Sequence, residues 1–150
     1  MGYSVFVKCR DVRQRDKMAN FLDKYFYPNP RDFPGMSAPT VDPCYCGRTR
    51  KPLVGIDYNG HLEFLFAWRL CAWMARMLRL RSFCYDGEED IKLAELGADS
   101  IGWWPITGPL LYGEKFYHEK AFQIHRELLR LTELWRNGNG KQEAQTVANS

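Results

Sequence analysis

Apolar residues recur along the chain with two different spacings, and the longest run with a helical spacing covers residues 61–81. On a helix, its apolar side chains would cover much more than the ~100° stripe of an ordinary surface helix. We therefore predict a central helix with protein packed on most of its sides. Arg69, Arg76 and Arg79 would each cost about 2.5–3.5 kcal/mol at bilayer depth, which excludes a transmembrane helix.

Other apolar patterns predict the elements around this helix. Alternating and β-branched positions predict strands at residues 3–9, 53–58 and 82–85, with an edge strand or ordered loop at 100–106. Helical spacing and helix-end signals predict helices at residues 11–26, 88–96 and 114–136. Asp11 and Gln14 are spaced as an N-cap residue and its capping-box partner. The last helix should bury Ala121, Ile124, Leu128, Leu131 and Trp135.

These elements predict an α+β (or α/β) fold. We expect a small mixed sheet of three to four strands, the long central helix 61–81 and the C-terminal helix 114–136. A strand–helix–strand connection of this length favours parallel neighbouring strands. The last helix should end at Asn137-Gly138.

The chain is long enough for one domain, with a loop and a tail outside its core. At 150 residues, we expect a single globular domain over 1–136. Residues 28–52 hold six of the eight prolines and no clear periodicity, which predicts a long Pro-rich loop. Residues 137–150 are small and polar and predict a tail.

Charge is unevenly distributed although the net charge is only +3. Residues 1–81 carry fourteen Lys and Arg against seven Asp and Glu, whereas residues 82–150 carry seven against eleven. The two parts could neutralise each other within the fold, or they could make a polar molecule that assembles head to tail. Five cysteines, an odd number, and a start unlike a signal peptide predict a cytoplasmic protein with reduced thiols.

Three arginines of the central helix, Arg69, Arg76 and Arg79, lie within about 80° of one another on a helical projection. Trp68 and Trp73 border them, and we call Arg69, Trp73, Arg76 and Arg79 the arginine stripe. Guanidinium groups beside indoles suit phosphates or a partner's carboxylates. Alternatively, the stripe is the one hydrated face of a buried helix, with arginines extending from apolar stems.

Two further groups are candidate binding residues. Arg48, Arg50 and Lys51 form a basic loop that could contact phosphates or simply be solvated. Trp103 and Trp104 are of the type that is enriched in protein interfaces.

Metal-binding signals are weak. Cys44 and Cys46 could share a metal ion, but a structural zinc site needs about four ligands and the chain has no second cysteine pair. Asp57 and Asp86 follow predicted strands, where paired carboxylates could hold Mg²⁺. We therefore expect no metal site and no cofactor, with these four residues as the candidates to test.

One tripeptide resembles a catalytic motif. Asp90-Ile91-Lys92 is similar to the Asp/Glu-x-Lys core of metal-dependent nucleases of the restriction-endonuclease type. The resemblance would imply metal-dependent cleavage of nucleic acid. In that family the lysine lies on a strand close after the strand of the first aspartate, whereas here a long predicted helix intervenes. Acidic residues in the first turn of a helix explain the same positions.

No nucleophile elbow, P-loop or dinucleotide fingerprint is present in the sequence. We therefore expect a non-enzymatic protein-binding protein, typical of the accessory or inhibitor proteins that phages and mobile elements carry. Its partner would be another protein or a second copy of itself, and we expect no association with a membrane. One alternative is a nucleic-acid-binding protein that uses the arginine stripe and the 48–51 loop. A second is a metal-dependent hydrolase or nuclease that uses Asp57 and Asp86.

Overall fold

The computed structural model describes residues 5–27, 31, 41–45, 51–58, 61–85, 89–96 and 114–149. In chain order the elements are β1 (Val5–Lys8), α1 (Val12–Tyr25), β2 (Val41–Tyr45), β3 (Pro52–Ile56), α2 (His61–Met77), β4 (Ser82–Tyr85), β5 (Glu89–Lys92), a short 3₁₀ helix (Leu93–Leu96) and α4 (Glu114–Asn149).

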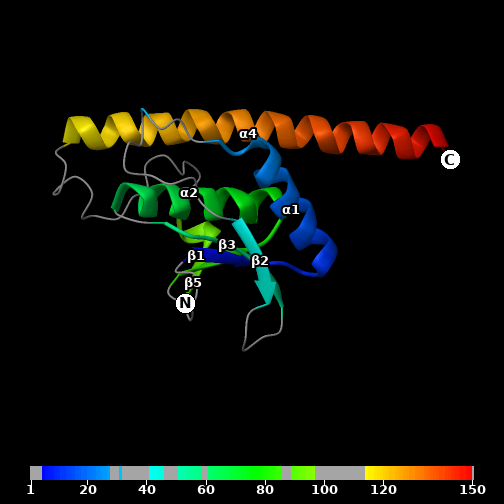
Figure 1. The fold of residues 1–150 in the computed structure, drawn as a ribbon, viewed down its shortest axis with the longest axis horizontal. Coiled ribbons are helices and arrows are strands. Elements are labelled where there is room, and N and C mark those ends of the chain that lie inside the picture. Colours follow the sequence, from blue (N-terminus) through cyan, green and yellow to red (C-terminus); the bar gives the residue numbers. More distant parts are fainter. Residues whose placement is uncertain are drawn as a thin grey trace.

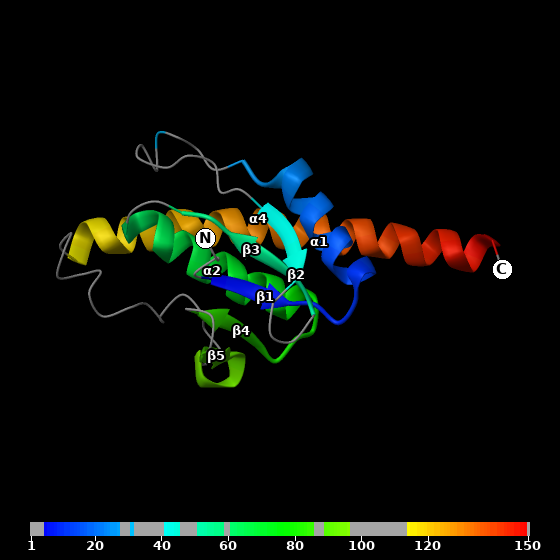
Figure 2. The same cartoon turned by 60° about the horizontal axis from the view of Figure 1, so that its bottom comes forward.

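The strands form one five-stranded sheet in the order β2-β3-β1-β4-β5 (Figure 2). Every pair of neighbours is antiparallel. The strands that α2 connects, β3 and β4, run in the same direction but are separated by β1. The first four strands and two helices thus have the split β-α-β, or ferredoxin-like, arrangement, with β5 added at one edge.

The α+β class is confirmed, with the long central helix and the C-terminal helix. The expected mixed sheet with parallel neighbours is wrong, because β1 occupies the position between β3 and β4. The sequence between β3 and β4 carries no information about which third strand is inserted between them.

Strand register divides the sheet residues between two faces. Val5 and Val7 of β1 join the main core, together with Val54 and Ile56 of β3 and Phe83 of β4. The alternate residues Phe6, Leu53 and Cys84 form a separate buried cluster. This alternation is the period of two that a strand imposes on its side chains.

The helices form two layers above one face of the sheet (Figure 1). α1 and α2 pack on the strands, and α4 crosses α2 on the side away from the sheet. From Glu63 to Ala75 every residue of α2 except Phe64 is buried. The prediction of a central helix packed on most sides is therefore confirmed.

An aromatic cluster joins α1, α2 and α4. Phe21 packs edge-on against Trp135 at a ring separation of 5.1 Å and stacks on Trp73 at 5.9 Å. Trp73 Nε1 donates a hydrogen bond to Thr132 Oγ1 at 2.8 Å. Arg130 Nη2 donates to the Tyr25 carbonyl at 2.6 Å, where α1 ends. The predicted buried face of α4, from Ala121 to Trp135, is confirmed.

One strand lies within the expected Pro-rich loop. β2 pairs with β3 along its whole length, and Pro43 lies opposite Val54. An edge strand tolerates proline because only one side of its backbone must donate hydrogen bonds to a neighbour. The partner strand, rather than local periodicity, therefore determines β2.

The expected helix at 88–96 is wrong. Residues 89–92 form β5, antiparallel to β4, and only residues 93–96 are helical, as a 3₁₀ turn. Asp90 and Lys92 are exposed while Ile91 packs against the core, which is the alternation of an edge strand.

The C-terminal helix is longer than expected, because α4 continues through Asn137 and Gly138 to Asn149. Its end extends beyond the rest of the fold in both views (Figures 1 and 2). Glycine costs only about 1 kcal/mol relative to alanine inside a helix, and a Cβ at Gly138 would meet no atom within 4 Å. The expectation of a non-helical tail is corrected. No helix in the described ranges is long and apolar enough to cross a membrane.

Candidate functional site

The arginine stripe does not form one continuous surface. Arg69 is only 4% exposed and Trp73 only 5%, whereas Arg76 is half-buried and Arg79 is exposed. Trp68 packs edge-on against Phe83 of the sheet at 5.1 Å, while Trp73 contacts α4. Of the two interpretations left open for the stripe, a continuous exposed surface is wrong at Arg69 and Trp73, because a helical projection gives the directions of side chains but not what covers them.

Arg79 lies where α2 ends, in an unusual backbone conformation. Its φ is 57°, in the left-handed region that favours glycine. The Leu80 amide donates to the Ala75 carbonyl at 2.7 Å, and the Arg79 amide donates to the Arg76 carbonyl at 3.1 Å. These two bonds define a Schellman motif, in which a residue with a side chain is strained by about 1–2 kcal/mol.

The first turn of α1 fixes this helix end in place. Asp11 Oδ1 accepts from the Gln14 amide at 2.7 Å, and Gln14 Oε1 accepts from the Arg10 amide at 2.8 Å. Gln14 Nε2 then donates to the Leu78 carbonyl at 3.2 Å, and Arg10 Nη2 donates to the Arg79 carbonyl at 2.7 Å. The predicted N-cap is confirmed, and its Gln14 partner also caps α2.

A pocket of about 370 Å³ lies between α1, the end of α2 and α4. Arg13, Lys17 and Arg79 line it, together with the N-cap Asp11 and the edge of Trp135. Lys17 Nζ is 5.0 Å from the centroid of the Trp135 ring. None of the three cations forms an ion pair with another described residue. We call Arg13, Lys17 and Arg79 the cationic pocket residues.

Sequence reasoning identified Arg79 as a candidate binding residue but not Arg13 and Lys17. The only signal was the general excess of basic residues before position 81. Tertiary packing, rather than any local motif, brings α1 beside the end of α2.

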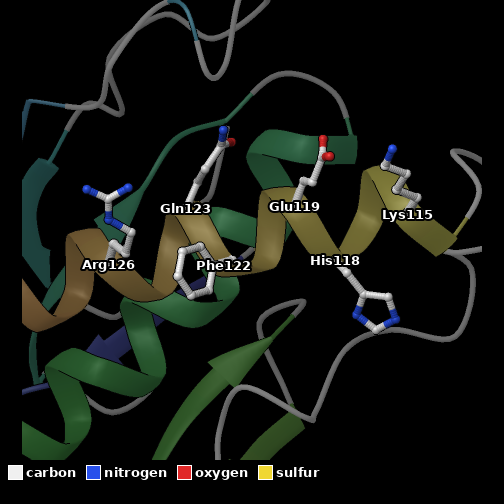
Figure 3. A pocket seen from close by; sticks show the side chains of 6 residues that line it. All are labelled: Lys115, His118, Glu119, Phe122, Gln123 and Arg126. Atoms are coloured by element: carbon white, nitrogen blue, oxygen red, sulfur yellow. The ribbon is translucent and has the colours of Figure 1, made fainter.

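A second pocket, of about 460 Å³, lies on the N-terminal half of α4. Lys115, Glu119 and Gln123 point to one side of the helix and His118 points to another (Figure 3). Phe122, on the same stretch, is 60% exposed. Leu129, one heptad later, is 55% exposed.

The candidate metal ligands are not gathered among the described residues. Asp57 is exposed after β3, and Asp90 lies on β5, three strands away. Neighbouring strands lie about 4.8 Å apart, so the backbones of β3 and β5 are separated by roughly 14 Å. Cys44 lies on β2, while Cys46 and Asp86 fall outside the described residues. No group of three His, Cys, Asp or Glu that could hold a metal ion occurs in the described part.

Asp90 has local partners instead. Cys84 Sγ donates to Asp90 Oδ1 at 3.1 Å, and Lys8 Nζ lies 3.8 Å from the same oxygen. Lys92 lies on β5 rather than on a helix. Asp90 thus contacts Lys8 of β1 and Cys84 of β4. The resemblance to the nuclease core would require Asp57 beside Asp90, but Asp57 follows β3, which is not a neighbour of β5.

The three buried cysteines, Cys9, Cys71 and Cys84, do not suit nucleophilic chemistry. Burial raises the pKa of Cys9 to about 11, and burial together with the hydrogen bond to Asp90 raises the pKa of Cys84 to about 12. Burial also raises the pKa of Cys71 well above its usual value. All three thiols are protonated at neutral pH, whereas the nucleophile in cysteine chemistry is the thiolate.

The remaining predicted binding residues are placed only in part. Lys51 is exposed just before β3. Arg48, Arg50, Trp103 and Trp104 fall outside the described residues.

Comparison of the chain with protein-family models, with curated proteins and with solved structures found no match.

Proposed function

We propose that the chain is a non-enzymatic binding protein that docks another protein on the outward face of α4. The exposure of Phe122 and Leu129, one heptad apart, carries this proposal. The opposite face of the same helix buries Ile124, Leu128 and Leu131 against the fold. α4 therefore has a second apolar stripe that the rest of the described chain does not cover.

The surroundings of this stripe suit a helix-docking surface. Lys115, Glu119, Arg126 and Glu133 are exposed around Phe122, and a polar rim about an apolar centre is typical of protein interfaces. An aromatic side chain at the centre supplies the kind of anchor that dominates binding energy.

The length of α4 adds support. It has 36 residues, and its last part extends beyond the α/β core (Figure 1). Helical segments that pack on nothing are marginally stable in water. A partner that packs along α4 would stabilise this extension as well as cover the stripe.

Photo-crosslinking tests the proposal. We would place p-benzoylphenylalanine at position 122, with position 27 as a matched control because Tyr27 is a similarly exposed aromatic on the first-helix side. We expect covalent adducts from position 122 that Leu129→Ser weakens, and none from position 27. Sedimentation of the purified chain would distinguish a second copy from another protein. No adduct from position 122, with a monomer at all concentrations, would contradict the proposal.

Nucleic-acid binding is the second candidate, and the cations Arg13, Lys17 and Arg79, which form no ion pair with another described residue, favour it. Each neutralised phosphate releases counterions, so affinity for an oligonucleotide should fall steeply between about 50 and 200 mM salt. Absence of binding at the lower salt concentration would remove this candidate. The role of an accessory or inhibitor protein stays a prediction from composition.

A further inference from the structure

We propose that the pocket between α1, α2 and α4 binds a dianionic phosphate group, as carried by a phosphate monoester. This site is separate from the α4 face that would dock a protein. The inference narrows the second candidate, nucleic-acid binding, to one pocket and one chemical group. In that sense the inference rests on the nucleic-acid candidate.

The charges that line the pocket complement those of a phosphate monoester. Three cations and one carboxylate line the pocket, which leaves two positive charges in excess. The carboxylate, Asp11, is the N-cap of α1 and already accepts a hydrogen bond from the backbone amide of Gln14. A phosphate monoester carries about −1.5 to −2 charges at pH 7, which matches this excess. An internal phosphodiester carries only one negative charge and would leave part of it uncompensated.

The chemical type and placement of the cations also suit a phosphate group. Two of them are guanidinium groups, whose planar forks match phosphate oxygens better than an ammonium group does. Arg13 lies on α1 and Arg79 lies in the turn that follows α2, so segments far apart in the sequence contribute the two guanidinium groups. The pocket volume, about 370 Å³, falls within the usual range for small ligands, about 300–1,000 Å³.

The backbone of Arg79 is held in a fixed position. Its backbone has a positive φ, and the carbonyl groups of Leu78 and Arg79 accept from Gln14 and Arg10. Strained residues persist where the surrounding structure holds them, and they are concentrated at functional sites. Glycine would be the less strained residue here, so the arginine provides a cation at the expense of backbone stability.

Other lining residues and the helix end border the same pocket. Met77, Leu78 and Trp135 line it beside the three cations. The N-terminus of α1 also borders the pocket, and its dipole favours an anion there.

Calorimetric titration at about 50 mM salt tests the inference. The probes are inorganic phosphate, a nucleoside 5′-monophosphate, and one oligonucleotide with either a 5′-phosphate or a 5′-hydroxyl end. We expect the three phosphate-bearing probes to bind, and the 5′-hydroxyl oligonucleotide to bind at least tenfold more weakly. Arg13→Gln and Arg79→Gln should each lower phosphate affinity at least tenfold. Arg126→Gln, an exposed arginine on the other pocket of α4, is the matched control and should leave affinity unchanged.

The outcomes separate the two ideas. Phosphate binding that Arg13→Gln and Arg79→Gln abolish supports the pocket even if no oligonucleotide binds, in which case the nucleic-acid candidate falls alone. Equal binding of both oligonucleotides, unaffected by the two variants, overturns the pocket and keeps that candidate. No binding of any phosphate probe overturns the pocket. Thermal melting confirms that each variant is folded, and Lys17→Gln replaces any variant that is not.

Discussion

The strained end of α2 predicts that replacing Arg79 by glycine stabilises the protein. The left-handed conformation at φ 57° costs a residue with a side chain about 1–2 kcal/mol. Glycine removes this strain but gives the unfolded chain more freedom, which costs about 0.5–1 kcal/mol. The bonds at this helix end use the backbone of Arg79, not its side chain, so they remain. We expect the free energy of unfolding to rise by about 0.5–1 kcal/mol.

Urea unfolding of three proteins would measure this: the original chain, Arg79→Gly and the matched control Arg79→Ala. Alanine keeps the strain and loses the charge, so it should lie within about 0.5 kcal/mol of the original. In thermal melting, a gain of 1 kcal/mol corresponds to about 2–4 °C for a domain of this size. If Arg79→Gly is no more stable than Arg79→Ala, the strain argument is refuted.

The same pair of variants connects stability with binding. Both remove the guanidinium group, so both should weaken phosphate binding at least tenfold, although only the glycine variant gains stability. Opposite changes in stability and affinity are expected where a strained residue serves a site. A glycine variant that retains full affinity would show that Arg79 does not contact the ligand.

Two further predictions concern buried groups. Thr132→Val should lower the free energy of unfolding by about 1–3 kcal/mol in urea titration, because the Trp73 indole N–H would lose its acceptor; an unchanged midpoint would show that this bond contributes nothing. The contribution of three buried thiols to stability should also be constant below about pH 9 and fall as the pH rises from 9 to about 12. Burial raises the pKa values of Cys9, Cys71 and Cys84 above 9.0 in the folded state, so the unfolded chain loses its thiol protons first. Urea midpoints at pH 8 and pH 10 measure this fall, which Cys84→Ser should reduce.

Local signals were sufficient for the elements that pack on the core. The spacing of apolar residues predicted α2 and the buried face of α4, and the Asp11–Gln14 pair predicted the start of α1. Each depends on residues within a few turns of one another. The edge strands β2 and β5 were missed because their partners, β3 and β4, fix them through backbone bonds that few side chains reveal. The end of α4 was wrong because Asn137-Gly138 weakens a helix without breaking it.

The candidate site residues also show the difference between local signals, which the sequence reveals, and long-range packing, which it does not. The helical projection placed Arg69, Arg76 and Arg79 on one side, but Arg69 and the two indoles are buried and Arg79 lies beyond the last residue of α2. Arg79 is exposed in the turn that follows the end of α2 at Met77. Arg13 and Lys17 join it from a helix more than sixty positions earlier in the sequence, a proximity that the Gln14–Leu78 and Arg10–Arg79 bonds enforce.

The position of α4 explains why the fold can offer two separate surfaces. Its inward face supplies Trp135 to the cationic pocket and Thr132 to Trp73, so the docked α4 contributes one of the residues that line the pocket. Its outward face carries Phe122 and Leu129, which contribute nothing described to that docking. Substitutions on the outward face should therefore leave phosphate binding unchanged, whereas a substitution that loosens docking, such as Thr132→Val, should weaken it. If both kinds of variant weaken phosphate binding equally, the outward residues also help to hold α4 in place, and the two surfaces are not separate.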